Sequence, residues 1–96
     1  MIHLDKIYQK IITTIVQTHA PTAKILAFGS RVKGTHAPAS DVDIALDAGA
    51  PIHWLTIATI KEDLMESDIP YQVDVLDYHS VADYIQQTID HHHHVL

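Results

Sequence analysis

Three aspartates in this sequence have the residue type and spacing needed to hold divalent cations. Asp41 and Asp43 are separated by one residue, and Asp74 lies in a later apolar segment. On a strand, side chains two residues apart project from the same face, so the first two carboxylates can bridge hard cations such as Mg²⁺. A third carboxylate from Asp74 allows a two-ion site, in which one cation lies beside an acceptor hydroxyl and another beside a triphosphate.

A glycine-rich turn before these aspartates could bind phosphate. It is the segment GSRVKG, residues 29–34, which follows a short apolar run. Gly29 lets the backbone turn closely around an anion, and the amides exposed there can donate hydrogen bonds together with the Ser30 hydroxyl. Arg31 and Lys33 would add cationic donors nearby. The turn is therefore a candidate site for the triphosphate of a nucleotide.

The turn and the first two aspartates require strands to position them. The run Lys24–Phe28 predicts a buried strand that ends at the glycine turn. Residues Thr35–Ser40 include a proline and are expected to form a loop. In Asp41–Asp47 the apolar side chains alternate with aspartates, which predicts a strand with one buried face. The segment Tyr71–Leu76 is rich in strand-forming residues and predicts the strand that carries Asp74.

Helices are predicted around these strands. Apolar residues recur at three- and four-residue spacing from Leu4 to Pro21, and a similar pattern runs from Trp54 to a point before Pro70. Ser80 with Asp83 resembles a capping box that opens a last helix. We therefore expect one α+β domain over residues 1–96, a two-layer core with a small mixed sheet of three strands, or slightly more, packed against helices.

Composition limits the function further. The 96 residues carry 12 acidic and 6 basic side chains, a formal charge of −6, which disfavours direct binding of a long nucleic acid. There is no cysteine, so disulfides and zinc thiolate sites are excluded. No apolar run reaches the roughly 20 residues of a membrane span, and the first residues lack the features of a secretion signal. We expect a cytoplasmic protein.

The motifs together resemble those of the polymerase-β-type nucleotidyltransferase superfamily, and more narrowly its minimal nucleotidyltransferase (MNT) branch. The resemblance is carried by GSRVKG, SDVDIAL and VDVLD, and it extends over most of the chain. It implies that Gly29 and Ser30 grip the triphosphate, that Asp41 and Asp43 are metal ligands, and that Asp74 completes the catalytic triad. Relatives often carry arginine at position 33, where this chain has lysine, which keeps the charge but presents fewer donors.

The resemblance also implies a substrate and a partner. The substrates would be ATP or another nucleoside triphosphate with Mg²⁺, and the partner would be a small helical HEPN protein encoded nearby. By analogy, the pair would be a toxin–antitoxin system in which AMP is transferred to a tyrosine of the partner. Exposed apolar residues on the first and last helices also allow a homo- or hetero-oligomer.

Alternatives remain open for several of these residues. Arg31 could contact phosphate or form a structural salt bridge with an aspartate. Asp47 and Asp77 are interpreted as surface or strand-end residues. Four consecutive histidines, His91–His94, follow the last predicted helix and could chelate a cation, but a functional metal role for them is disfavoured.

Two other functions compete with nucleotidyl transfer to a protein. The same fold could neutralise its partner by tight association alone, with a nucleotide-binding site that does not catalyse. It could also transfer nucleotide to a small molecule. The length of the chain leaves no separate domain to bind such a substrate, which disfavours the second alternative.

Overall fold

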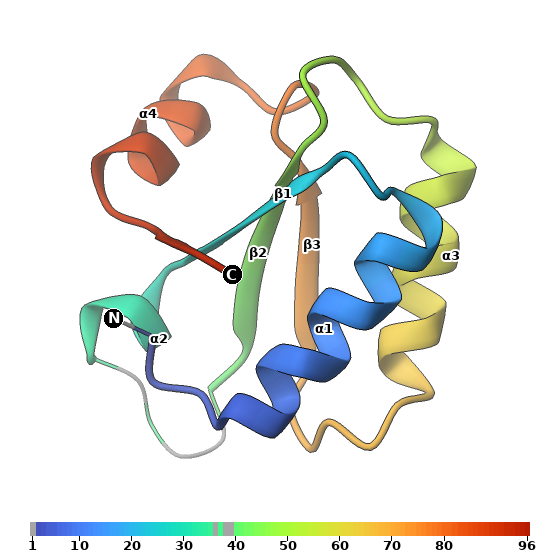
Figure 1. The fold of residues 1–96 in the computed structure, drawn as a ribbon. Helices are drawn as coiled ribbons and strands as arrows, with labels where there is room; N and C mark the ends of the chain where they lie inside the picture. The colour runs from blue at the N-terminus through green and yellow to red at the C-terminus, as the bar shows by residue number, and fades with distance from the viewer. Residues whose placement is uncertain (1, 36, 38–39) are drawn as a thin grey trace.

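The structure is a computed structural model that describes residues 2–35, 37 and 40–96. Helices and strands follow one another along the chain (Figure 1). Their bounds are α1 Lys6–His19, β1 Lys24–Phe28, α2 Ser30–Lys33, β2 Val42–Asp47, α3 Trp54–Met65, β3 Val73–Asp77, α4 Asp83–His91 and β4 His94–Val95. The loop predicted over residues 35–40 lies partly outside the described residues, at positions 36, 38 and 39.

The strands form one mixed sheet in the order β3-β2-β1-β4. Strand β1 pairs antiparallel with β2, whereas β3 pairs parallel with β2 because helix α3 returns the chain to the same end of the sheet. The two-residue β4 pairs antiparallel with β1. The sheet confirms the predicted α+β class and is slightly larger than three strands, since β4 adds a fourth.

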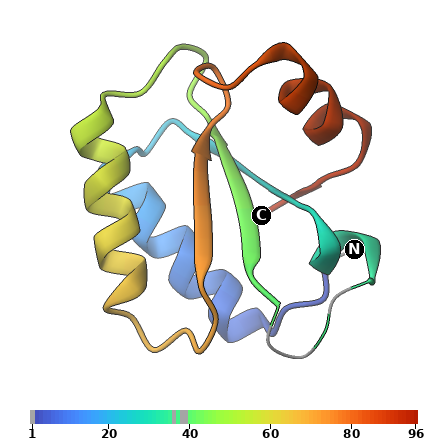
Figure 2. The same cartoon turned by 180° about the vertical axis from the view of Figure 1, so that it is seen from behind.

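Helices α1 and α3 lie side by side against one face of the sheet, and α4 lies on the other side (Figures 1 and 2). The main core is apolar and joins α1 and α3 to the face of β2 that carries Val42, Ile44 and Leu46. The opposite face has a smaller cluster, in which Ile89 of α4 packs against Leu26 and Ala45. The alternation predicted for β2 therefore separates the core from the aspartate face.

The start of the last helix differs from the prediction. Helix α4 begins at Asp83 after Ala82, and no side chain caps its first turn. The Ser80 hydroxyl donates instead to Asp77 Oδ2 at 2.8 Å, so the predicted capping box is wrong. This hydrogen bond joins residues three apart in the chain and uses the hydroxyl that the capping box would need.

Within the described part of the chain, no helix is both long and apolar enough to cross a membrane.

Candidate active site

The candidate site lies at one end of the sheet, where β1 ends and the parallel strands β2 and β3 begin. Asp43 stands directly opposite Asp74 in the register of β2 with β3, and opposite Phe28 in the register with β1. Because paired residues on neighbouring strands project from the same face, the two carboxylates lie together. The structure therefore brings together two of the three predicted aspartates.

The electrostatics of Asp43 reflect this crowding. Burial, with the nearby carboxylates of Asp74 and then Asp41, raises the pKa of Asp43 from its ordinary value of 3.8 to about 6. A hydrogen bond between the side chains of Asp43 and Asp74 contributes to the raised pKa. The site thus concentrates negative charge that a cation or a proton can neutralise.

The glycine turn lies against the same carboxylate. Gly29 has φ 81° and ψ −157°, a conformation that side-chain-bearing residues rarely adopt. A Cβ atom at this position would clash with Oδ2 of Asp43. Glycine is therefore required both by the backbone conformation and by the close approach of the turn to the aspartate.

Ser30 follows at the start of the short helix α2. Its side chain is half-buried. Among the described residues, neither the Ser30 N–H nor its hydroxyl has a hydrogen-bond partner. These two donors are available to an anion beside Asp43, as the sequence predicted for a phosphate-binding turn.

Arg31 points into the protein rather than into solvent. Its side chain is only 4% exposed, and its guanidinium donates to the Ser40 carbonyl from Nε and Nη2, at 3.1 and 2.9 Å, and to the His3 carbonyl at 3.0 Å. It also lies over the Tyr71 ring, 4.0 Å from the centroid. In this conformation Arg31 ties the residue before Asp41 to α2. A direct contact with phosphate stays a prediction and would require these bonds to break.

Lys33 and Asp41 are both exposed. Lys33 lines a shallow depression with His91 and other residues of α4. Asp41 precedes β2 and is close enough to Asp43 to raise its pKa. Each side chain is thus free to turn toward a ligand bound at the end of the sheet.

The donor set suits a hard divalent cation. The paired carboxylates of Asp43 and Asp74, with Asp41 nearby, supply the oxygen ligands that Mg²⁺ prefers, and their mutual repulsion favours a cation between them. In the described parts of the chain, however, no three histidine, aspartate or glutamate side chains already converge as a metal-binding group. Asp41 would have to turn inward to become the third ligand.

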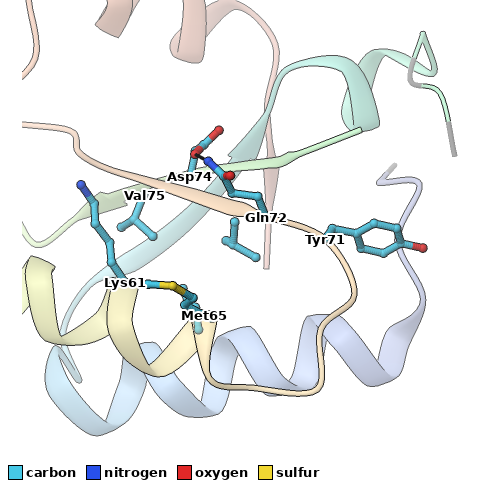
Figure 3. A pocket seen from close by; sticks show the side chains of 8 residues that line it. Lys61, Met65, Tyr71, Gln72, Asp74 and Val75 are labelled. Atoms are coloured by element: carbon cyan, nitrogen blue, oxygen red, sulfur yellow. Dashed lines mark hydrogen bonds between the residues drawn. The ribbon is translucent and has the colours of Figure 1, made fainter. Parts of the chain in front are cut away.

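The side chain of Gln72 is a member of the site that the sequence analysis missed. Its amide donates to Asp74 Oδ1 at 2.8 Å, and Figure 3 shows both side chains projecting to the same side of β3. The signal was present in the sequence, because residues 72 and 74 are two apart on a strand and share a face. Glutamine by itself carries no chemistry that would have singled it out.

The other candidate side chains have structural roles. Asp77 is the last residue of β3, which confirms its interpretation as a strand-end residue, but it is only 9% exposed and accepts hydrogen bonds from Ile52 N–H at 2.7 Å and from Ser80. Asp47 remains partly exposed and bonds to His79 Nε2 at 2.6 Å. The hydrogen bonds of Asp47 with the Gly49 N–H and with His79 lower the pKa of Asp47.

The histidine run is divided among different elements. His91 is the last residue of α4, and His93 Nδ1 bonds to the Ile89 carbonyl at 2.8 Å. His94 belongs to β4 and pairs with Ala27 of β1. The run therefore begins at the end of α4 and leads into β4, which pairs with the edge of β1.

Comparison with known proteins gives one consistent result. Residues 9–96 match the family described as polymerase beta, nucleotidyltransferase. The chain is 38% identical over 79 residues to the probable protein adenylyltransferase MntA of Haemophilus influenzae, an alignment covering 82% of this chain and 69% of that protein. A crystal structure of a toxin-antitoxin with AMP-PNP has a TM-score of 0.78 and 23% identity, covering 91% of this chain and 70% of that one. The structural likeness shows a shared fold.

Proposed function

The chain belongs to the polymerase beta nucleotidyltransferase family, and on this premise we propose that it transfers AMP from ATP to a hydroxyl of a partner protein. The observation that carries this proposal is the pairing of Asp43 with Asp74 beside the Gly29 turn. It puts an acidic, cation-attracting centre next to unpaired hydrogen-bond donors for phosphate. Both parts are needed for nucleotidyl transfer.

The similar proteins support the choice of substrates. One relative is described as a probable protein adenylyltransferase, which supports a protein acceptor and an adenylyl donor. The structural neighbour contains AMP-PNP, an analogue of ATP, in a toxin-antitoxin. Together with the resemblance to the MNT branch, this supports an antitoxin role and a HEPN-type toxin as the acceptor.

In the proposed reaction each group has a defined task. The Ser30 N–H and hydroxyl donate to the triphosphate, and Asp41, Asp43 and Asp74 would hold Mg²⁺. When bound, Mg²⁺ neutralises phosphate charge and makes the acceptor hydroxyl easier to deprotonate. Asp74 orients that hydroxyl and accepts its proton.

The bonds of this transfer balance without a further reactant. The acceptor oxygen forms a bond to the α-phosphorus, while the bond from that phosphorus to the bridging oxygen of the β-phosphate breaks. The products are the adenylylated protein and pyrophosphate, and the proton of the hydroxyl passes to Asp74. The roles of Arg31 and Lys33 in this scheme are supporting ones, in shaping the turn and adding positive charge.

The decisive experiment is transfer of labelled AMP in the presence of Mg²⁺ to the helical protein encoded beside this chain. Wild-type protein should label the acceptor, and Asp74→Asn should lower the rate by at least about a hundredfold, since a proton acceptor at the reacting oxygen contributes factors of this size. Asp83→Asn, at an exposed position on α4, is the matched control.

A second comparison separates catalysis from binding. If a variant with alanine at Asp41, Asp43 and Asp74 still neutralised the partner fully, the protein would act as a binding module. Absence of label transfer with any nucleoside triphosphate would contradict the proposed activity.

A further inference from the structure

Strand β3 lies at the edge of the sheet, and its outer side is unpaired. The Gln72 carbonyl accepts from Val42 N–H at 2.9 Å, and Tyr78 N–H donates to the Leu46 carbonyl at 3.0 Å, so the even-numbered residues bond to β2. Because backbone groups alternate along a strand, those of Val73 and Val75 face the free edge. Among the described residues, no hydrogen-bond partner is found for them there.

A groove runs along this free edge. We define the edge groove as the cavity of about 400 Å³ between α3 and β3, lined by Lys61, Leu64, Met65 and residues 71–75 (Figure 3). Met65 is 81% exposed at its rim. A second depression beside Trp54, which is 72% exposed, shares Lys61 with it. The combination of exposed apolar side chains and an unpaired strand is unusual for a surface that remains in water.

The edge groove is continuous with the candidate active site. Asp74 belongs to its lining, and Figure 3 shows Asp74 and Gln72 on one side of β3, with Lys61, Met65 and Val75 on the other. A chain added along this edge would alternate its side chains between these two sides. One residue would therefore face Asp74, while its immediate neighbours would face Met65.

The acidic residues near the edge groove indicate which charge its occupant should carry. Glu62 is exposed on the last turn of α3, and Glu66 and Asp68 are exposed just after the helix ends at Met65. The carboxyl end of a helix also carries partial negative charge. This end of the groove therefore favours lysine or arginine in an occupant, and disfavours a second copy of this acidic chain.

We propose that the edge groove binds an extended segment of the acceptor protein as an additional strand along β3. The segment presents its acceptor hydroxyl on the Asp74 side, flanks it with apolar residues that face Met65, and carries basic residues toward the end of α3. Main-chain hydrogen bonds to Val73 and Val75 supply affinity, and the alternating side chains supply specificity. The inference rests on the proposed transfer to a protein hydroxyl, and it names the form in which that hydroxyl reaches the site.

The first test measures binding without catalysis. The probe is a synthetic peptide with tyrosine between two valines and two arginines at one end, added without ATP. Amide hydrogen exchange at Val73 and Val75 should slow on addition of this peptide. The same peptide with N-methyl groups on its valines should give no protection, because its edge donors are blocked. Equal protection by both peptides, or none by either, would overturn the proposal.

The second test uses variants in transfer to the helical partner. Met65→Glu should raise the KM for the acceptor about tenfold, whereas Leu55→Glu, at another exposed apolar position of α3, should change it less than about twofold. Val73→Pro removes a donor that faces the free edge, and it too should raise KM about tenfold relative to Val73→Ala, since a lost hydrogen bond has about that effect.

The outcomes separate this proposal from the function on which it rests. Transfer by the wild-type protein with Met65→Glu matching Leu55→Glu would overturn the edge groove and leave the transferase activity standing. Protection of Val73 and Val75 without any transfer would support the groove and contradict the activity. If these amides were already protected in the chain alone, and their protection increased with the concentration of the chain, the occupant would be a second copy. That result would overturn the proposal.

Discussion

Gln72, the residue before the edge strand β3, donates a hydrogen bond from its side-chain amide at 2.8 Å to the carboxylate of Asp74 in that strand. The bond restrains Oδ1 of Asp74 and so limits the rotation of its carboxylate. Asp74 is the residue that we expect to meet the acceptor hydroxyl. Gln72 is therefore a positioning residue for the proposed base.

Replacing Gln72 by alanine should lower kcat roughly tenfold, because a carboxylate that is misoriented by a small amount loses much of its effect on the reacting oxygen. The KM for ATP should change little. Steady-state transfer of labelled AMP checks both values. Gln17→Ala, at an exposed position on α1, is the control. Equal rates for the two variants would show that Gln72 has no such role.

Gly29→Ala should destabilise the protein by about 2–4 kcal/mol, because it adds a side chain in a strained conformation and places a Cβ atom on Asp43 Oδ2. Gly49 provides a matched control. It has the same φ of 81° but nothing within 4 Å of an added Cβ, so Gly49→Ala should cost only about 1 kcal/mol. Urea unfolding measures both free energies.

The difference between these two glycine variants isolates the contact with Asp43. Combining Gly29→Ala with Asp43→Ala should recover part of the loss, since the clashing oxygen is removed. If Gly29→Ala and Gly49→Ala lost equal stability, the close approach of the turn to Asp43 would not be the cause.

Much of this site could be predicted from local sequence patterns. Alternation along β2 placed Asp43 on the face away from the core, and the apolar run before Gly29 predicted β1 with its observed bounds. These signals are local, because the alternation of apolar residues and the glycine at the end of a strand can both be read within one short segment. That Asp74 joins the first two aspartates was a hypothesis about segments far apart in the chain, and its support in the structure is the register of β2 with β3.

The rest depends on contacts between distant residues. Arg31 had two open interpretations, and its inward direction depends on the Ser40 and His3 carbonyls and the Tyr71 ring, which sequence spacing does not bring together. Strand β4 has only two residues, so it has no pattern of its own and forms because β1 offers an open edge. Both features are therefore decided by contacts between segments that are distant in the sequence.

Asp43→Asn should raise the thermal midpoint at about pH 7.5 and have a smaller effect at about pH 4. The folded pKa of Asp43, about 6, exceeds its ordinary value of 3.8, so ionisation is less favourable in the folded state than in the unfolded one. The resulting loss of stability is absent below 3.8, develops as the pH rises toward 6, and is complete above it. Asparagine removes the charge and therefore removes this loss.

Thermal unfolding across this pH range checks the Asp43 prediction. Asp83→Asn, at an exposed position on α4, should show no comparable change between the two pH values. Addition of Mg²⁺ at about pH 7.5 should raise the midpoint of the wild-type protein more than that of Asp43→Asn, because a cation offsets the same repulsion. If Asp43→Asn raised the thermal midpoint equally at both pH values, the raised pKa of Asp43 would not be the cause of the effect.

Asp77→Ala should destabilise the fold by about 2–3 kcal/mol while leaving kcat close to that of the wild-type protein, because it removes an acceptor for several donors and leaves them unsatisfied. The donors are Ile52 N–H, His79 N–H and the Ser80 hydroxyl, which together join the segments before α3 and before α4 to the end of β3. Asp68→Ala, at an exposed position, should cost less than about 0.5 kcal/mol. Chemical denaturation measures the stability and transfer assays on the same preparations measure kcat. A loss of kcat in Asp77→Ala without a loss of stability would show that Asp77 acts in catalysis rather than in the fold.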